Sequence, residues 1–156
     1  MLTEKQRIEL LGAFGEDLVE KTLKLKGFLV KKSEDKYDSE KDFTVENLKI
    51  EVKTVVPWFT ENALTIDASQ YKKCYNSDCV FFVCVPSKRL SNYSNTKYDG
   101  NIYAVDPKKS TWIAKTAGKS LPKYIVRIDD PGVTLFHTIT DEYTLDMLRH
   151  LSTSKS

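Results

Sequence analysis

The apolar residues nearest the N-terminus recur at three- and four-residue intervals, which is the spacing of one helix face. This pattern runs from Ile8 to Leu25. Thr3 and Gln6 precede it with the spacing of a capping box, and Gly27 follows it where a helix stop is expected. The pattern therefore predicts one long amphipathic helix between Thr3 and Gly27.

Two glycines interrupt this predicted helix on its apolar side. Gly12 and Gly15 lie within or next to the apolar stripe, and each costs about 1 kcal/mol relative to alanine in a helix interior. We therefore expect another element to pack closely against them. Glu16 lies at the edge of the same stripe, beside Val19.

The next segments alternate or cluster their apolar residues as strands do. They predict a short strand over residues 28–32, a hairpin of 42–45 and 48–56 around a turn at Glu46-Asn47, and a strand near Leu64. Asp67 is placed to cap a short helix, Ala68 to Tyr75, and the apolar run 79–85 predicts a strand buried on both faces. Weaker signals indicate strands near 102–105, 111–114 and 124–128 and a terminal helix over 140–151. The fold class is therefore mixed α/β, with a mixed sheet flanked by helices.

Length and composition fit one globular domain, residues 1–156. A chain of 156 residues with 40% apolar residues can bury a core without metal or disulfide support. Cys74, Cys79 and Cys84 are five residues apart, a spacing that fits no zinc signature, and we expect reduced core thiols. No apolar run is long enough for a membrane span, and the N-terminus has no signal-peptide pattern, so we expect a cytoplasmic protein with no membrane partner.

The small net charge hides a basic middle segment. Residues 69–127 contain 11 Lys or Arg against 3 Asp or Glu, interleaved with aromatic residues that include Tyr98, Tyr103 and Trp112. Cations mixed with aromatics suit a phosphate backbone and exposed bases, although a solvated face has the same composition. The candidate nucleic-acid-binding residues are Lys72, Lys73, Lys88, Arg89, Lys108, Lys109, Lys115 and Lys119.

The hairpin register places two carboxylates together. A two-residue or four-residue loop around Glu46-Asn47 pairs Asp42 with Glu51 across the strands, whereas an odd loop loses that pairing. Alternation along the strand puts Ile50 in the core and Glu51 with Lys53 on the opposite face. Asp42, Glu51 and Lys53 are therefore expected to share one patch.

Like charges opposite each other destabilise a hairpin unless a cation lies between them. Mg²⁺ is commonly held by one or two carboxylates together with water and substrate phosphate, and the ammonium of Lys53 could act on a metal-bound water. Phosphodiester hydrolysis requires these groups. The alternative is that the three side chains form a solvated, salt-bridged face of an exterior hairpin.

At these residues the sequence resembles the PD-(D/E)xK nuclease superfamily, which includes restriction endonucleases, archaeal-type Holliday junction resolvases and some group I intron homing endonucleases. The matching segments are 12–16, Gly27-Phe28, Asp42 and 50–54, within about residues 10–86. Lys41 stands where the motif's dispensable proline would be. The resemblance implies a restriction-endonuclease-like αβββαβ core over residues 1–86, with 87–156 as a β-rich extension and terminal helix that completes the fold and contacts DNA.

The resemblance also implies roles for individual residues. Asp42 and Glu51 would hold the metal, Lys53 would serve the attacking water, and Glu16 would approach from the first helix as a further metal or water contact. Gln70, in the helix 68–75, resembles an accessory polar residue that some members place near the catalytic site.

The expected function is a Mg²⁺-dependent DNA endonuclease of the restriction or homing type, with Mn²⁺ able to substitute and no organic cofactor. Because one such site cuts one strand, we expect a homodimer or higher homo-oligomer. A Holliday junction resolvase is the alternative within this class. A non-catalytic nucleic-acid-binding module on the same fold, and a structural domain with no nucleic-acid partner, are the alternatives outside it.

Overall fold

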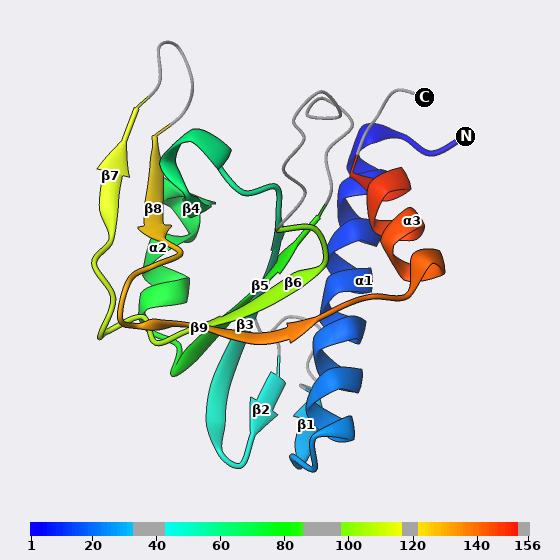
Figure 1. Cartoon of the computed structure of the whole chain (residues 1–156), viewed down its shortest axis with the longest axis horizontal. Helices are drawn as coiled ribbons and strands as arrows, with labels where there is room; N and C mark the ends of the chain where they lie inside the picture. The colour runs from blue at the N-terminus through cyan, green and yellow to red at the C-terminus, as the bar shows by residue number, and fades with distance from the viewer. Residues whose placement is uncertain (33–42, 86–97, 117–121, 153–156) are drawn as a thin grey trace.

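In the part of the chain that the structure describes, three helices and nine strands are arranged as two sheets with helices against them (Figure 1). The computed structural model describes residues 1–32, 43–85, 98–116 and 122–152. The helices are α1 (Glu4–Leu25), α2 (Ala68–Tyr75) and α3 (Glu142–Leu151), with a 3-10 turn, η1, at Phe59–Glu61. Among the described residues, no helix is both long and apolar enough to cross a membrane.

Among the described residues, the larger sheet has six strands in the order β1-β2-β3-β5-β6-β9. Their bounds are β1 (Val30–Lys32), β2 (Phe43–Val45), β3 (Leu48–Val55), β5 (Cys79–Cys84), β6 (Asn101–Val105) and β9 (Val133–Thr138). The pair β3 and β5 is parallel, and the other neighbours are antiparallel. The predicted mixed sheet is thus confirmed, although β9 at its edge is absent from the sequence prediction.

A second sheet of three strands differs from the expectation of a single sheet. It contains β4 (Ala63–Asp67), β8 (Lys123–Arg127) and β7 (Ile113–Lys115), in the order β4-β8-β7. All of its pairings are antiparallel, and β4 pairs with a strand some sixty residues later in the chain, Ala63 opposite Arg127 and Asp67 opposite Lys123. Local patterning identifies each strand, but it carries no information about which distant strand becomes its neighbour.

The two faces of the larger sheet are covered by different elements. The side chains of Val19 in α1, Val52 in β3 and Leu148 in α3 belong to one apolar cluster. Residues of β4, α2, β5 and β8, such as Leu64, Cys74 and Phe82, form the other. Figure 1 accordingly shows α1 and α3 on one side of the larger sheet, with α2 and the second sheet on the other. The prediction that β5 is buried on both faces is confirmed.

The predicted capping of α1 is confirmed. Thr3 Oγ1 accepts from the backbone N–H of Gln6, the Gln6 side chain accepts from the Thr3 N–H, and Gly27 follows the helix with φ of +92°. A Cβ on Gly15 would lie 1.8 Å from Thr54 Oγ1, whereas one on Gly12 would meet nothing within 4 Å. The expected close packing therefore holds for Gly15, which lets α1 approach β3, and is wrong for Gly12.

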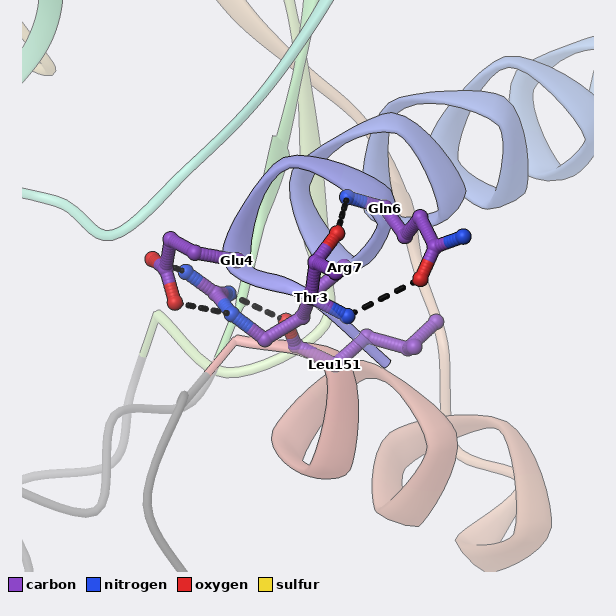
Figure 2. A network of polar contacts seen from close by, with 5 residues as sticks. All are labelled: Thr3, Glu4, Gln6, Arg7 and Leu151. Carbon is purple, nitrogen blue, oxygen red and sulfur yellow. Dashed lines mark hydrogen bonds and ion pairs between the residues drawn. The ribbon is translucent and has the colours of Figure 1, made fainter. Parts of the chain in front are cut away.

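The start of α1 also holds the end of α3. The guanidinium of Arg7 donates to the backbone carbonyl of Leu151, the last residue of α3, and pairs with Glu4 one turn earlier in α1 (Figure 2). A cation at this position satisfies a terminal carbonyl and opposes the negative end of the helix dipole. Arg7 thereby joins the two helices that cover one face of the larger sheet.

Candidate active site

The hairpin that carries the site has the predicted register. Phe43 pairs with Ile50 and Val45 with Leu48, around a two-residue turn in which Glu46 and Asn47 have positive φ of 49° and 73°. Such a turn matches the twist of the flanking strands. Asp42, predicted to lie opposite Glu51, falls outside the described residues, so its expected pairing stays a prediction.

Side chains on β3 alternate between the two faces as expected. Ile50 and Val52 lie in the apolar cluster beneath α1, while the Glu51 and Lys53 side chains meet residues of α2 on the other face. Glu51 is only 1% exposed. The alternative interpretation, a solvated face of an exterior hairpin, is therefore wrong for Glu51, because α2 and the second sheet cover that face of the larger sheet.

Two lysines approach the same oxygen of the buried glutamate. Lys53 Nζ lies 3.4 Å from Glu51 Oε1, and Lys73 Nζ, from α2, lies 3.4 Å from the same atom. The side chains of Lys53 and Lys73 are 19% and 27% exposed, so both ammonium groups lie at the boundary between the protein interior and solvent. The three groups together carry one more positive than negative charge, which favours an anion at this boundary.

Gln70 is the second residue of α2, after Lys73, that lies at this site. Lys53 Nζ donates a hydrogen bond of 2.7 Å to Gln70 Oε1. Gln70 and Lys73 are three residues apart on α2 and therefore share one helix face. The structure thus brings the predicted residues Glu51, Lys53 and Gln70 together and adds Lys73.

The sequence predicts Lys73 as a nucleic-acid-binding residue and does not predict its contact with Glu51. The available signal was its i, i+3 spacing from Gln70, which places both side chains on the same side of the predicted helix. Only the parallel pairing of β3 with β5, and the packing of α2 across them, shows that this side faces Glu51.

The start of α2 is fixed by its neighbours in the second sheet. Asp67 precedes the helix as predicted, but its side chain makes no capping hydrogen bond and instead accepts from Lys123 Nζ at 2.9 Å. The backbone N–H of Ala68 donates to the carbonyl of Pro122 at 3.1 Å. β8 therefore anchors the first turn of α2, the turn before Gln70.

Glu16 lies on α1, on the other side of β3 from α2. It is half-buried and follows Gly15, whose backbone lies against Thr54. Within the described ranges, no three His, Cys, Asp or Glu side chains gather as a metal-binding group. The expected contribution of Glu16 and Asp42 to one site with Glu51 stays a prediction.

The oxygen atoms present fit a hard divalent cation. Glu51 offers carboxylate oxygens, and Mg²⁺ binds such donors with water completing its octahedron. The nearby ammonium groups could bind phosphate oxygens or influence a proton on a bound water. Groups of these kinds could take part in phosphodiester hydrolysis.

The candidate DNA-binding lysines fall into different environments. Lys72 and Lys109 are exposed and have no acidic partner among the described residues. Lys115 Nζ pairs with Glu61 at 3.5 Å, and Lys108 Nζ donates to the backbone carbonyl of Tyr75 at 2.9 Å. Three further candidates, Lys88, Arg89 and Lys119, lie outside the described residues.

Two tyrosines of the basic segment pack inward. Tyr98 and Tyr103 are 4% and 6% exposed and belong to the apolar cluster beneath the second sheet. Trp112 is half-buried, and its indole N–H donates to the Pro107 carbonyl at 2.8 Å. Tyr98 and Tyr103 therefore help to fill the core and do not present exposed rings on which bases could stack.

The prediction that the three cysteines are reduced thiols is confirmed. Cys74, Cys79 and Cys84 form no disulfide bond, and Cys74 and Cys84 are buried. Burial raises the pKa of the Cys79 thiol to about 12 and that of Cys84 further still. The thiolate form needed for metal binding or nucleophilic attack is thus disfavoured at both positions.

Comparisons with known proteins give no family assignment. No protein-family model, no curated protein and no solved structure matches the chain.

Proposed function

We propose that the protein is a Mg²⁺-dependent DNA endonuclease that hydrolyses phosphodiester bonds. The observation that carries the proposal is the meeting of Glu51, Lys53 and Gln70 where β3 passes beneath α2. A buried carboxylate two residues from a half-buried lysine, whose ammonium is held by an amide oxygen at 2.7 Å, is an arrangement suited to phosphoryl chemistry.

The order of the elements supports the same proposal. An N-terminal helix, an antiparallel meander of β1, β2 and β3, the helix α2, and then β5 parallel to β3 follow the αβββαβ order of a restriction-endonuclease-like core. The insertion of β4 before α2, paired with β8, distinguishes this chain from the minimal order.

Each residue has a defined part in the proposed reaction. Glu51, with Asp42, would hold the divalent ion, and the ion would supply an activated water and a counter-charge for the scissile phosphate. Gln70 keeps the Lys53 ammonium in place, so that Lys53 orients the water or stabilises the charge that develops on phosphate oxygens. Glu16 is proposed as a further water or metal contact from α1. A homodimer supplies the two sites that cutting both strands requires.

A cleavage assay with matched variants tests the proposal. Supercoiled plasmid, linear duplexes and synthetic four-way junctions are incubated with the protein in Mg²⁺, in Mn²⁺ and in EDTA. We expect metal-dependent cleavage that disappears in Lys53→Met and persists in Lys49→Met. Lys49 lies on the same strand and its replacement removes the same charge, but its side chain is exposed.

Each outcome selects one function. Cleavage of linear duplex at defined sequences supports the restriction or homing type, whereas cleavage confined to the four-way junction supports a resolvase. DNA binding without cleavage in either metal would replace the proposal with a non-catalytic binding module. Equal activity of Lys53→Met and wild type would remove Lys53 from the site.

A further inference from the structure

Lys73 differs from Lys53 in how it is held. Both ammonium groups lie 3.4 Å from Glu51 Oε1, but Lys53 also donates to Gln70 at 2.7 Å. Among the described residues, the ion pair with Glu51 is the one polar contact of the Lys73 ammonium. Lys73 also has the larger exposed fraction of the two side chains, 27% against 19%. Of the two cations, Lys73 is therefore the one that can leave Glu51 at lower cost.

We propose that Lys73 is an internal counter-ion that competes with the divalent cation for Glu51 and, once displaced, binds a phosphate of the DNA. This inference rests on the proposed function and adds a regulatory residue to its site.

The electrostatics of the site explain why such competition arises. A carboxylate that is 1% exposed requires nearby positive charge, which the two lysines supply while no other cation is bound. A divalent cation at the same carboxylate would repel both ammonium groups, and the less restrained one moves. The long flexible Lys73 side chain on α2 can then turn toward solvent, where the DNA backbone would lie.

The exchange couples the two ligands. DNA phosphate that attracts Lys73 away from Glu51 makes the carboxylate available, so DNA binding strengthens metal binding and, by linkage, the metal strengthens DNA binding. If Lys73 pairs with Glu51 for about nine tenths of the time, the apparent affinity for the metal is reduced about tenfold. Metal would then be taken up mainly in the presence of substrate.

Calorimetric titration of the protein with Mg²⁺ alone provides the first test. We expect Lys73→Met to bind Mg²⁺ about tenfold more tightly than wild type. Lys72→Met is the matched control, because Lys72 is the adjacent, exposed lysine of α2. The affinity of the Lys72→Met variant for Mg²⁺ should stay near that of wild type. An Mg²⁺ affinity of Lys73→Met equal to or weaker than that of wild type, or no uptake by either protein, would overturn the inference.

The second test uses DNA binding in EDTA, measured by fluorescence anisotropy, and needs neither metal nor cleavage. Glu51→Gln removes the negative charge that holds Lys73, so we expect it to raise DNA affinity. This gain in DNA affinity should vanish when Lys73→Met is combined with Glu51→Gln. The control Lys72→Met should lower DNA affinity by the same factor in the wild type and in Glu51→Gln. A gain that survives Lys73→Met would overturn the inference.

The two tests separate failure of the inference from failure of the proposed function. If the wild type cleaves DNA with Mg²⁺ but Lys73→Met takes up the ion no more tightly, the nuclease proposal stands and the role of Lys73 falls. If the wild type neither binds nor cleaves DNA, the nuclease proposal falls, and the Mg²⁺ titration still decides whether Lys73 competes for Glu51.

Discussion

Lys53 of β3 donates a hydrogen bond of 2.7 Å to Gln70 of α2, seventeen positions later in the chain. The bond ties the strand that carries the candidate site to the helix that covers it. Because Lys53 Nζ also lies 3.4 Å from Glu51 Oε1, its position is defined from two sides. An ammonium held in this way is oriented before any substrate arrives, which is the condition under which electrostatic stabilisation is most effective.

Replacing Lys53 should separate chemistry from binding. We expect Lys53→Ala to abolish cleavage while DNA affinity stays within about tenfold of wild type, because the ammonium acts on the reacting groups more than on ground-state binding. Single-turnover cleavage rates and equilibrium DNA binding in EDTA measure the two quantities. Equal losses in both would make Lys53 a phosphate anchor instead.

Gln70 should act through Lys53. Gln70→Leu removes the hydrogen-bond acceptor, and we expect cleavage at saturating DNA to slow by about 10- to 100-fold, as is found for partners that orient a reactive group. Ser69→Ala, at the exposed neighbouring position of α2, is the control and should leave the rate unchanged. A rate for Gln70→Leu close to that of wild type would show that Glu51 alone is enough to place the lysine.

Much of the site's framework follows from local sequence. Glu46 and Asn47 both adopt positive φ, and this turn fixes the register that brings Ile50 opposite Phe43. Because side chains alternate along a strand, the common face of Glu51 and Lys53 follows from the register. These features depend on residues within a few positions of one another, which is why patterning predicts them.

The burial of Glu51 and its contact with Lys73 depend on distant pairings. β4 pairs with β8, a strand distant in the sequence, so that Ala63 lies opposite Arg127. The resulting second sheet helps to hold α2 over β3. The sequence pattern does not predict edge strand β9 either, because this strand too is identified by its pairing with another strand. Its burial pattern shows no clean alternation, and Leu135 is 53% exposed, so only pairing with β6 identifies it.

The two glycines of α1 should respond to alanine in opposite directions. At Gly15 a Cβ would meet Thr54 Oγ1 at 1.8 Å and Thr54 Cβ at 3.1 Å. The separation of α1 from β3 must then increase, and we expect Gly15→Ala to lower the free energy of unfolding by about 1–3 kcal/mol. Gly12→Ala meets nothing within 4 Å and should raise it by up to about 1 kcal/mol.

Chemical denaturation of the two glycine variants measures this difference. Thr54→Ala in the Gly15→Ala background removes the hydroxyl that the new methyl group meets, and should recover part of the loss. Similar stabilities for Gly12→Ala and Gly15→Ala would contradict the close approach of α1 to β3.

The thiols should be unreactive in the folded protein. Burial raises the pKa of Cys79 to about 12, so at pH 8 its thiol stays protonated, and the reactive thiolate is scarce. We expect little reaction of the native protein with 5,5′-dithiobis(2-nitrobenzoic acid) at pH 8, and reaction of all 3 cysteines in guanidinium chloride. Rapid modification of the native protein at Cys79, located by mass spectrometry, would contradict this burial.

The raised thiol pKa also gives a direction to the pH dependence of stability. The Cys79 thiol has its ordinary pKa of about 9 in the unfolded chain and a pKa of about 12 in the folded chain. Between these two pH values the unfolded chain has released this proton, whereas the folded chain still holds it. The contribution of this thiol to the free energy of unfolding is therefore complete below pH 9 and decreases between pH 9 and 12. Cys79→Ser, which does not ionise there, should show a shallower alkaline decline in urea titrations. An unchanged slope would contradict the shift.

The salt dependence of DNA binding should distinguish unpaired lysines from paired ones. Lys72 on α2 and Lys109, next to the Lys108 that holds the Tyr75 carbonyl, lie near the end of α2. Each phosphate contact releases counterions, and log K falls with log salt by about 0.9 per contact on duplex DNA. We therefore expect Lys72→Ala with Lys109→Ala to flatten the slope by up to about two units. Lys108 is left intact, because its loss would also free the last carbonyl of α2.

The matched control removes two lysines that already have acidic partners. Lys115 pairs with Glu61 at 3.5 Å and Lys123 with Asp67 at 2.9 Å. Binding phosphate would require these lysines to give up their carboxylates, so Lys115→Ala with Lys123→Ala should change the slope by much less, although the net charge changes equally. Equal flattening by both pairs would show that net charge, not the end of α2, governs DNA affinity, and the assignment of Lys72 and Lys109 as phosphate contacts would then lose its support.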